Sequence, residues 1–264
     1  MRRFPYGSAM VTGASSGIGE AFARLLAQEG ADLVLVARRG ELLEQLAGEL
    51  KSAHGVSVEV LQLDLTDESQ LLAAQRRLTD PERPVELLVN NAGSSGSGYF
   101  AELPAERELH TVVLNAVVPL RLSRACLPGM IARGAGGIVN VSSLVAVLPK
   151  PRSATYAASK AFLSSLSESL GMEVARHGIH VTTVHTGLTR SGFHEAAGVP
   201  PEALPRMKWL TADQVARAGL DAVAAGRPST VPGLAYRIRL PLMRAMPRSV
   251  VRAITRRVHE KGQS

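Results

Sequence analysis

The sequence contains little cysteine, few aromatic residues and no long hydrophobic run. Cys126 is the only cysteine among 264 residues, so an internal disulfide is excluded and a reducing, cytoplasmic location is expected. No apolar run reaches the ~18 residues that a membrane-spanning helix needs. The amino-terminal stretch MRRFPYGSAMVTGASSG lacks the apolar centre of a secretory signal peptide, so we expect none. The seven histidines show no metal-ligand spacing, and we expect no metal site.

The net charge of +7 is concentrated near one end of the sequence. Residues 237–261 hold eight Lys or Arg and one acid, Glu260, so this segment carries the whole excess. The remaining charges balance, which argues against a nucleic-acid partner. We expect a catalytic domain over 1–236 and a basic helical extension over 237–264. We favour an extension that covers a pocket or contacts another subunit; the alternative is contact with a membrane surface or an acidic acyl carrier.

Apolar segments rich in Val, Ile and Leu alternate with longer helical patterns. The expected strands are 9–13, 32–38, 56–64, 85–91, 137–143, 179–187 and 229–232. The expected helices are 18–29, 40–53, 67–79, 105–132 and 154–177. This alternation predicts an α/β fold with a single Rossmann-like, doubly wound parallel sheet of about seven strands, flanked by helices. Ligands of such sheets bind beyond the carboxyl ends of the strands, so the residues that follow each strand are the candidates for chemistry.

A glycine-rich segment, TGASSGIG, follows the first expected strand and opens the first expected helix. Gly13 allows a tight exit from the strand, Gly17 lets the backbone approach a pyrophosphate, and Gly19 lets the helix lie close to the sheet. The start of the helix adds free N–H groups and a positive dipole end. We therefore expect a dinucleotide here. The other loop residues expected to contact it are Ser15, Ser16 and Ile18.

The acid that usually follows the second strand of an NAD site is absent. Ala37 stands in its place, and Arg38 and Arg39 come next. An arginine there can pair with the 2′-phosphate of NADP, which an acid would repel. We therefore expect NADP(H), bound mainly by Arg38 with help from Ser15. The residues expected to flank the adenine, after the third strand, are Asp64 and Leu65.

Four further motifs complete a recognisable set. They are NNAG at 90–93, Asn115, VNVSS at 139–143 and YAASK at 156–160. With TGASSGIG, they resemble the motifs of the short-chain dehydrogenase/reductase family, in order and spacing, over about residues 8–190. The resemblance implies an NADP-dependent oxidoreductase acting on a small-molecule carbonyl or alcohol. It implies cofactor contacts from Asn91, Ala92, Gly93, Tyr156, Lys160, Gly187, Leu188 and Thr189.

The resemblance also implies a catalytic set: Asn115, Ser143, Tyr156 and Lys160. The family's serine lies thirteen residues before its tyrosine, which selects Ser143 over Ser142. Tyr156 would give a proton to the reduced carbonyl. Lys160, one helical turn on, would hold the nicotinamide ribose and, with the oxidised nicotinamide nearby, would lower the pKa of Tyr156. Ser143 would bond to the substrate oxygen, and Asn115 would keep a water in a proton relay.

The family folds a lid over its substrate at the place of residues 188–210. The residues expected either to line an apolar pocket or to pack the lid are Val145, Leu148, Phe193, Met207 and Trp209. The pocket alternative predicts a medium to large apolar ketone or aldehyde. A 3-oxoacyl-thioester reductase and a non-catalytic NADP(H)-binding sensor or scaffold are the other functions considered. The family implies a homodimer or homotetramer, and Thr186 replaces its usual proline before Gly187.

Overall fold

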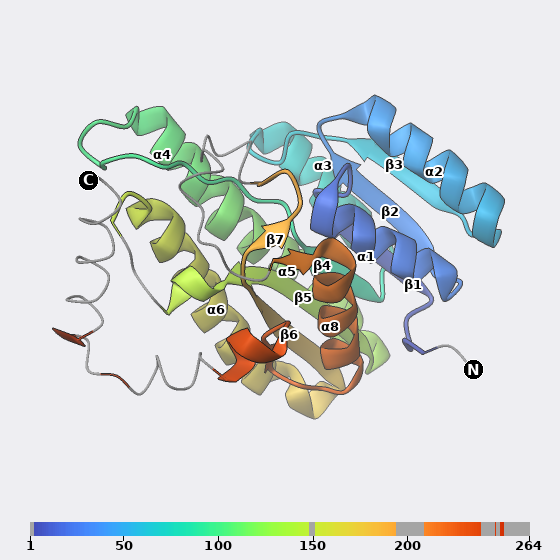
Figure 1. Cartoon of the computed structure of the whole chain (residues 1–264). Coiled ribbons are helices and arrows are strands. Elements are labelled where there is room, and N and C mark those ends of the chain that lie inside the picture. The colour runs from blue at the N-terminus through green and yellow to red at the C-terminus, as the bar shows by residue number, and fades with distance from the viewer. Residues whose placement is uncertain (1–2, 148–150, 194–208, 239–245, 247–248, 251–264) are drawn as a thin grey trace.

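The computed structural model describes residues 3–147, 151–193, 209–238, 246 and 249–250 (Figure 1). The predictions for Leu148, for Met207 and for most of the basic extension lie outside these residues. Among the described residues, we find no helix with both the length and the apolar character needed to cross a bilayer.

Seven strands form one parallel sheet in the order β3-β2-β1-β4-β5-β6-β9, which confirms the predicted fold. The strands are β1 Ser8–Thr12, β2 Asp32–Ala37, β3 Val58–Gln62, β4 Leu87–Asn90, β5 Gly136–Ser143, β6 Ile179–Thr186 and β9 Ser229–Thr230. The direction of winding reverses between β1 and β4. A doubly wound sheet binds its ligand at this reversal, beyond the strand ends.

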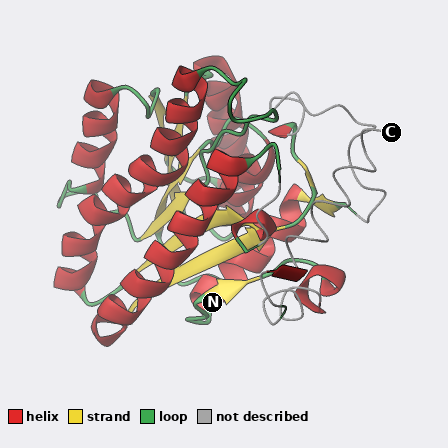
Figure 2. Cartoon of the chain, turned by 90° about the vertical axis from the view of Figure 1, so that its left-hand side faces the viewer, coloured by secondary structure: helices red, strands yellow, loops and turns green. Residues whose placement is uncertain are grey.

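Helices cover both faces of the sheet (Figure 2). One side carries α1 Gly17–Gln28, α2 Gly40–His54 and α8 Ala212–Ala224; the other carries α3 Glu68–Leu78, α5 Val118–Arg133 and α6 Ala154–Val174. Successive strand side chains point to opposite faces, so Val11 packs with the first group and Met10 with the second. Because both faces are buried, these strands are almost continuously apolar.

The segment 105–132, expected to be one continuous helix, is interrupted by a π-helical turn. It consists of α4 Ala105–Val112, a π-helical turn Val113–Val117 that contains Asn115, and α5. Single π-turns inside α-helices are frequent at functional sites.

A second, two-stranded parallel pair was not predicted. It joins β7 Thr189–Arg190 to β8 Leu210–Thr211, with the backbone N–H of Leu210 donating to Leu188 O at 2.9 Å. The two ends of the expected lid segment therefore meet.

Candidate active site

A hydrogen-bonded cluster joins the carboxyl ends of β1 and β4. Thr12 Oγ1 accepts bonds from the N–H groups of Asn91 and Ala92, each at 3.0 Å. Asn91 Nδ2 donates to the carbonyls of Thr12 and Gly13 at 3.0 and 3.3 Å. Thr12 was not predicted from the sequence, where its only signal was its place before the first loop glycine. These bonds fix the NNAG loop against the glycine-rich loop.

The glycine-rich loop has the backbone that a phosphate cradle requires. Gly13 and Gly17 have φ of 66° and 59°, in the left-handed region that favours glycine. A Cβ on Gly13 would lie 2.9 Å from Asn91 Nδ2, and one on Gly19 would lie 2.5 Å from it. Ser16 begins α1 without a side-chain capping bond, so the first N–H groups of the helix are available to an anion. The chain therefore fits the pyrophosphate of a dinucleotide here.

The two arginines after β2 have different partners. Arg39 Nη2 donates to Ser15 Oγ at 2.9 Å and to Ser16 Oγ at 2.6 Å. Arg38 Nη1 instead lies 3.9 Å from Asp64 Oδ2, with 68% of its side chain exposed. The sequence favoured Arg38 as the main phosphate contact, whereas the structure brings Arg39 to the glycine-rich loop.

The two residues expected at the adenine differ in their surroundings. Asp64 Oδ1 accepts bonds from the N–H and hydroxyl of Thr66 at 2.9 and 2.7 Å. Burial opposes ionisation, but these bonds and the charge of Arg38 hold the pKa of Asp64 below its ordinary value. Leu65 is buried in the hydrophobic core. Its side chain therefore serves packing, and Asp64 is the residue whose side chain can meet a ligand.

Tyr156, Lys160 and Ser143 come together at the end of β5. Lys160 Nζ donates to the Val141 carbonyl at 2.9 Å and lies 5.9 Å from the centroid of the Tyr156 ring. The Ser143 side chain is hydrogen-bonded to Tyr156. Because Tyr156 and Lys160 are one turn apart on α6, both face this strand end, as the sequence predicted.

Burial determines the pKa values of this pair. Loss of solvent raises the pKa of Tyr156 to about 12, although the bond with Ser143 acts in the other direction. Burial lowers the pKa of Lys160 to about 8. In the protein alone, desolvation of the phenolate outweighs the hydrogen bond with Ser143. Such a phenol keeps its proton until a stronger base forms beside it. The lowering of the pKa expected with the oxidised nicotinamide bound stays a prediction.

Asn115 is almost fully buried, and its side chain holds the loop after β4. Its Oδ1 accepts from the N–H of Ser94 at 2.9 Å, and Nδ2 donates to Ser94 O at 2.8 Å and to Ser159 Oγ at 3.1 Å. A Cβ on Gly93 would lie 2.9 Å from Asn115 Oδ1 and 3.4 Å from Lys160 Nζ. Asn115 therefore fixes the loop and α6 beside Lys160, and its water relay stays a prediction.

A row of buried polar side chains, missed in the sequence, fixes α6 on β5. Ser142 Oγ donates to the Lys160 carbonyl at 3.0 Å and lies 2.9 Å from Ser164 Oγ. Asn140 Nδ2 donates to Ser167 Oγ at 2.8 Å. The sequence contains the pattern behind these bonds: Asn140 and Ser142 are two residues apart on the strand, and Ser164 and Ser167 are three residues apart on the helix. These bonds set the register between the helix and the strand that carry the catalytic groups.

Thr186, where the family usually has a proline, is the last residue of β6. Thr186 pairs with Ser143 at the end of the sheet, and its Oγ1 donates to Ser142 O at 3.0 Å. Thr189 Oγ1 donates to the Gly187 carbonyl at 3.1 Å, so this hydroxyl already has an acceptor. The threonine thus extends β6 to the edge of the site.

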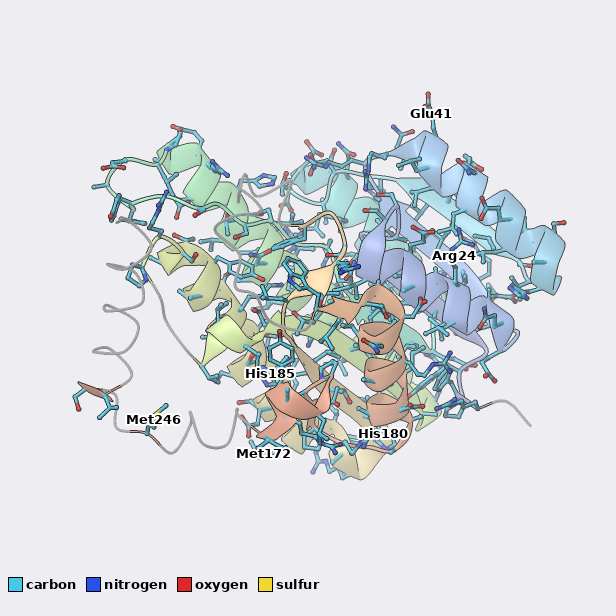
Figure 3. All side chains as sticks on the ribbon, in the orientation of Figure 1. Arg24, Glu41, Met172, His180, His185 and Met246 are labelled. Carbon is cyan, nitrogen blue, oxygen red and sulfur yellow. The ribbon has the colours of Figure 1, made fainter. Side chains whose placement is uncertain are left out.

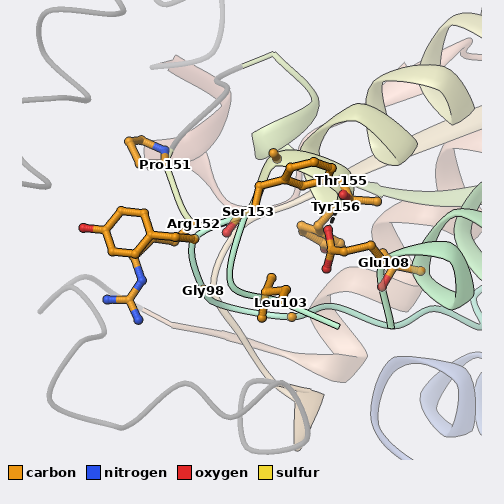
Figure 4. A pocket seen from close by; sticks show the side chains of 13 residues that line it. Gly98, Leu103, Glu108, Pro151, Arg152, Ser153, Thr155 and Tyr156 are labelled. Carbon is orange, nitrogen blue, oxygen red and sulfur yellow. Dashed lines mark hydrogen bonds between the residues drawn. The ribbon is translucent and has the colours of Figure 1, made fainter. Parts of the chain in front are cut away.

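A cavity of about 150 Å³ opens beside Tyr156 (Figure 4). Its lining comes from the loop after β4, from α4, from residues 151–153 and from the start of α6. At the ring of Tyr156 lies Phe193, 5.8 Å away between centroids, which brings this predicted residue to the site. Val145 follows Ser143 in a 3₁₀ turn, and Trp209 is half-buried just before β8.

The family model for short chain dehydrogenases matches residues 8–199. This chain belongs to the short-chain dehydrogenase/reductase family. One relative is a very-long-chain 3-oxoacyl-CoA reductase of Coprinopsis cinerea, 34% identical over 84% of this chain and 66% of the relative. This short-chain dehydrogenase spans 54–67% of the length of the first curated relatives that it matches.

Two solved structures show the same fold. A short-chain dehydrogenase from Sphingobium yanoikuyae in complex with NADPH is 36% identical, with a TM-score of 0.82 over 91% of this chain and 96% of that one. A bulky-bulky ketone specific alcohol dehydrogenase from Comamonas testosteroni is 31% identical, with a TM-score of 0.78 over 91% and 95% of the two chains.

Proposed function

We propose that this protein is an NADPH-dependent oxidoreductase that reduces the carbonyl of a medium to large apolar ketone or aldehyde, and oxidises the alcohol in reverse. The observation that carries the proposal is the meeting of Ser143, Tyr156 and Lys160 beside a cavity and a phosphate cradle. A sensor or scaffold would need the cradle but not these three side chains.

Each group has a role in this reduction. When bound, the reduced nicotinamide supplies a hydride to the substrate carbon. Ser143 Oγ donates a hydrogen bond to the substrate oxygen as negative charge develops on it. Tyr156 Oη then gives its proton to that oxygen, which completes the alcohol. Lys160, held by the Val141 carbonyl, stabilises the phenolate that remains.

The preference for NADP(H) rests on Arg39. Its guanidinium donates hydrogen bonds to the hydroxyls of Ser15 and Ser16, at the edge of the phosphate cradle. A guanidinium with neighbouring hydroxyl donors suits a 2′-phosphate. The Sphingobium yanoikuyae relative, which is solved with NADPH, supports this choice.

Arg39→Ala is expected to raise the Kd for NADPH by about 10- to 100-fold, because a charge-assisted hydrogen bond contributes about 1.5–3 kcal/mol. The Kd for NADH should change little, since NADH has no 2′-phosphate. Fluorescence titration of both cofactors measures the two constants. Arg38→Ala is the matched control and should have the smaller effect. If Arg38→Ala raised the Kd for NADPH more than Arg39→Ala, Arg38 would be the residue that binds the 2′-phosphate.

A second prediction concerns the substrate. Phe193 beside Tyr156 and the adjoining cavity support an apolar carbonyl compound, as do relatives named for very-long-chain 3-oxoacyl-CoA and for bulky-bulky ketones. We expect kcat/KM to rise at least about tenfold from propanone to aryl-alkyl ketones, as apolar contacts are added. NADPH oxidation across a graded panel tests this. Preference for small polar carbonyls would contradict it, and preference for a 3-oxoacyl thioester would favour the alternative reductase.

The protein's association state and location are part of the same proposal. Large apolar side chains are exposed on α4, α5 and α6, among them Leu109 at 64% and Met172 at 74%. Met172 is labelled in Figure 3. A homodimer or homotetramer that joins these helices would cover them. The free, buried thiol of Cys126 supports a cytoplasmic location.

A further inference from the structure

Arg152 has an unusual backbone conformation. Its φ of 63° is the only positive value among the non-glycine residues that the structure describes. This left-handed region is unfavourable for a residue with a long side chain, so the surroundings must hold it there. The N–H of Gly98 does so in part, by donating to the Arg152 carbonyl at 3.2 Å. The bond joins the loop after β4 to the segment before α6, which form two walls of the cavity.

The Arg152 guanidinium is held in place but not neutralised. Its Cζ lies 5.6 Å from the centroid of the Tyr99 ring, a cation–π contact that fixes the direction of the side chain. None of the ion pairs found in the described part of the chain involves Arg152. The residue is exposed, so its positive charge is available to a ligand.

This charge stands at the opposite end of the cavity from the reacting group. Figure 4 shows the Arg152 side chain at one end of the lining and Tyr156 with Glu108 at the other, with Leu103 between them. The Glu108 carboxylate accepts a hydrogen bond from Thr155, which keeps it at the Tyr156 end. The lining therefore runs from a proton donor, past apolar side chains, to a cation.

We propose that this cavity binds an oxo acid: a carbonyl compound whose apolar chain ends in a carboxylate. The carbonyl lies at Tyr156, the chain runs along Leu103 and the Tyr99 ring, and the carboxylate pairs with Arg152. The inference rests on the proposed function and narrows its substrate class. The carbonyl becomes a hydroxyl by addition of hydride and proton, and the carboxylate is unchanged. The product is a hydroxy acid.

Matched substrates test the pairing. We expect kcat/KM for 4-oxo-4-phenylbutanoate to exceed that for its methyl ester by about tenfold or more. A series with longer methylene spacers should show an optimum length for the acids and none for the esters. Arg152→Gln should lower the acid-to-ester ratio of kcat/KM at least about tenfold. Arg152→Gly also removes the charge and should lower the ratio equally. Because glycine adopts the left-handed backbone readily, this variant controls for misfolding.

Binding of a non-reducible acid separates this inference from the proposed function. Calorimetry with 4-phenylbutanoate should give a Kd at least about tenfold lower for wild type than for Arg152→Gln. Equal binding, or an acid-to-ester ratio near one in wild type, would overturn the oxo-acid inference. Reduction of the ester alone would leave the proposed function standing, whereas failure to reduce any carbonyl would overturn the proposed function itself.

Discussion

Tyr156→Phe is expected to lower kcat for carbonyl reduction by about 10²- to 10⁴-fold, the usual contribution of a positioned proton donor. The phenylalanine keeps the ring beside Phe193 and removes only the hydroxyl. The anionic oxygen left by reduction would then have no acid in contact with it. Because the tyrosine is not part of the phosphate cradle, the Kd for NADPH should stay close to that of wild type. Steady-state turnover and fluorescence titration measure the two quantities.

Tyr6→Phe is the matched control. Tyr6 is also buried, and its hydroxyl lies 3.5 Å from the Val223 carbonyl, away from the strand ends that form the site. The same loss of one hydroxyl should leave kcat near the wild-type value. If Tyr156→Phe turned over as fast as Tyr6→Phe, the proton would have to come from another group, and the proposed mechanism would fail.

Local sequence patterns were sufficient for the features that depend on a few neighbouring residues. The left-handed backbone at Gly13 and Gly17 follows from glycine's freedom at a strand exit. The shared face of Tyr156 and Lys160 follows from helical spacing. The parallel sheet follows from apolar strands that alternate with helices. None of these requires knowledge of distant contacts.

Features set by distant contacts could not be predicted in this way. Arg38 and Arg39 are adjacent and chemically identical, and only the path of the chain after β2 turns the second one toward Ser15. The cavity wall depends on Gly98 meeting Arg152, far along the chain. The raised pKa of Tyr156 in the protein without cofactor could not be predicted from spacing, because burial depends on the whole fold. Sequence spacing identifies the reacting groups, but their electrostatics depend on the fold.

Lys160→Met is expected to stabilise the cofactor-free protein by about 2 kcal/mol at pH 7 while abolishing turnover. Burial lowers the pKa of Lys160 from 10.5 to about 8, so keeping its charge in the fold costs about 3 kcal/mol at ~1.4 kcal/mol per pKa unit. Loss of the hydrogen bond to the Val141 carbonyl destabilises the variant by about 1 kcal/mol, which offsets part of this gain. The methionine fills similar space without a charge. Urea unfolding of both proteins gives the difference.

The pH dependence distinguishes this cause from better packing. Between the folded pKa of about 8 and the unfolded value of 10.5, Lys160 binds more protons in the unfolded wild-type chain, so its contribution to wild-type stability rises with pH through this window. The advantage of Lys160→Met should therefore be constant below pH 8 and shrink above it. The raised pKa values of Tyr6, Cys126 and Tyr156 do not arise from Lys160, so they affect both proteins alike and cancel in the difference. Lys51→Met, at an exposed position in α2, is the control and should show no such trend. If the stability advantage of Lys160→Met did not change with pH, the cost of burying the ammonium would not be its cause, and the fold would not be paying a stability penalty for the catalytic lysine.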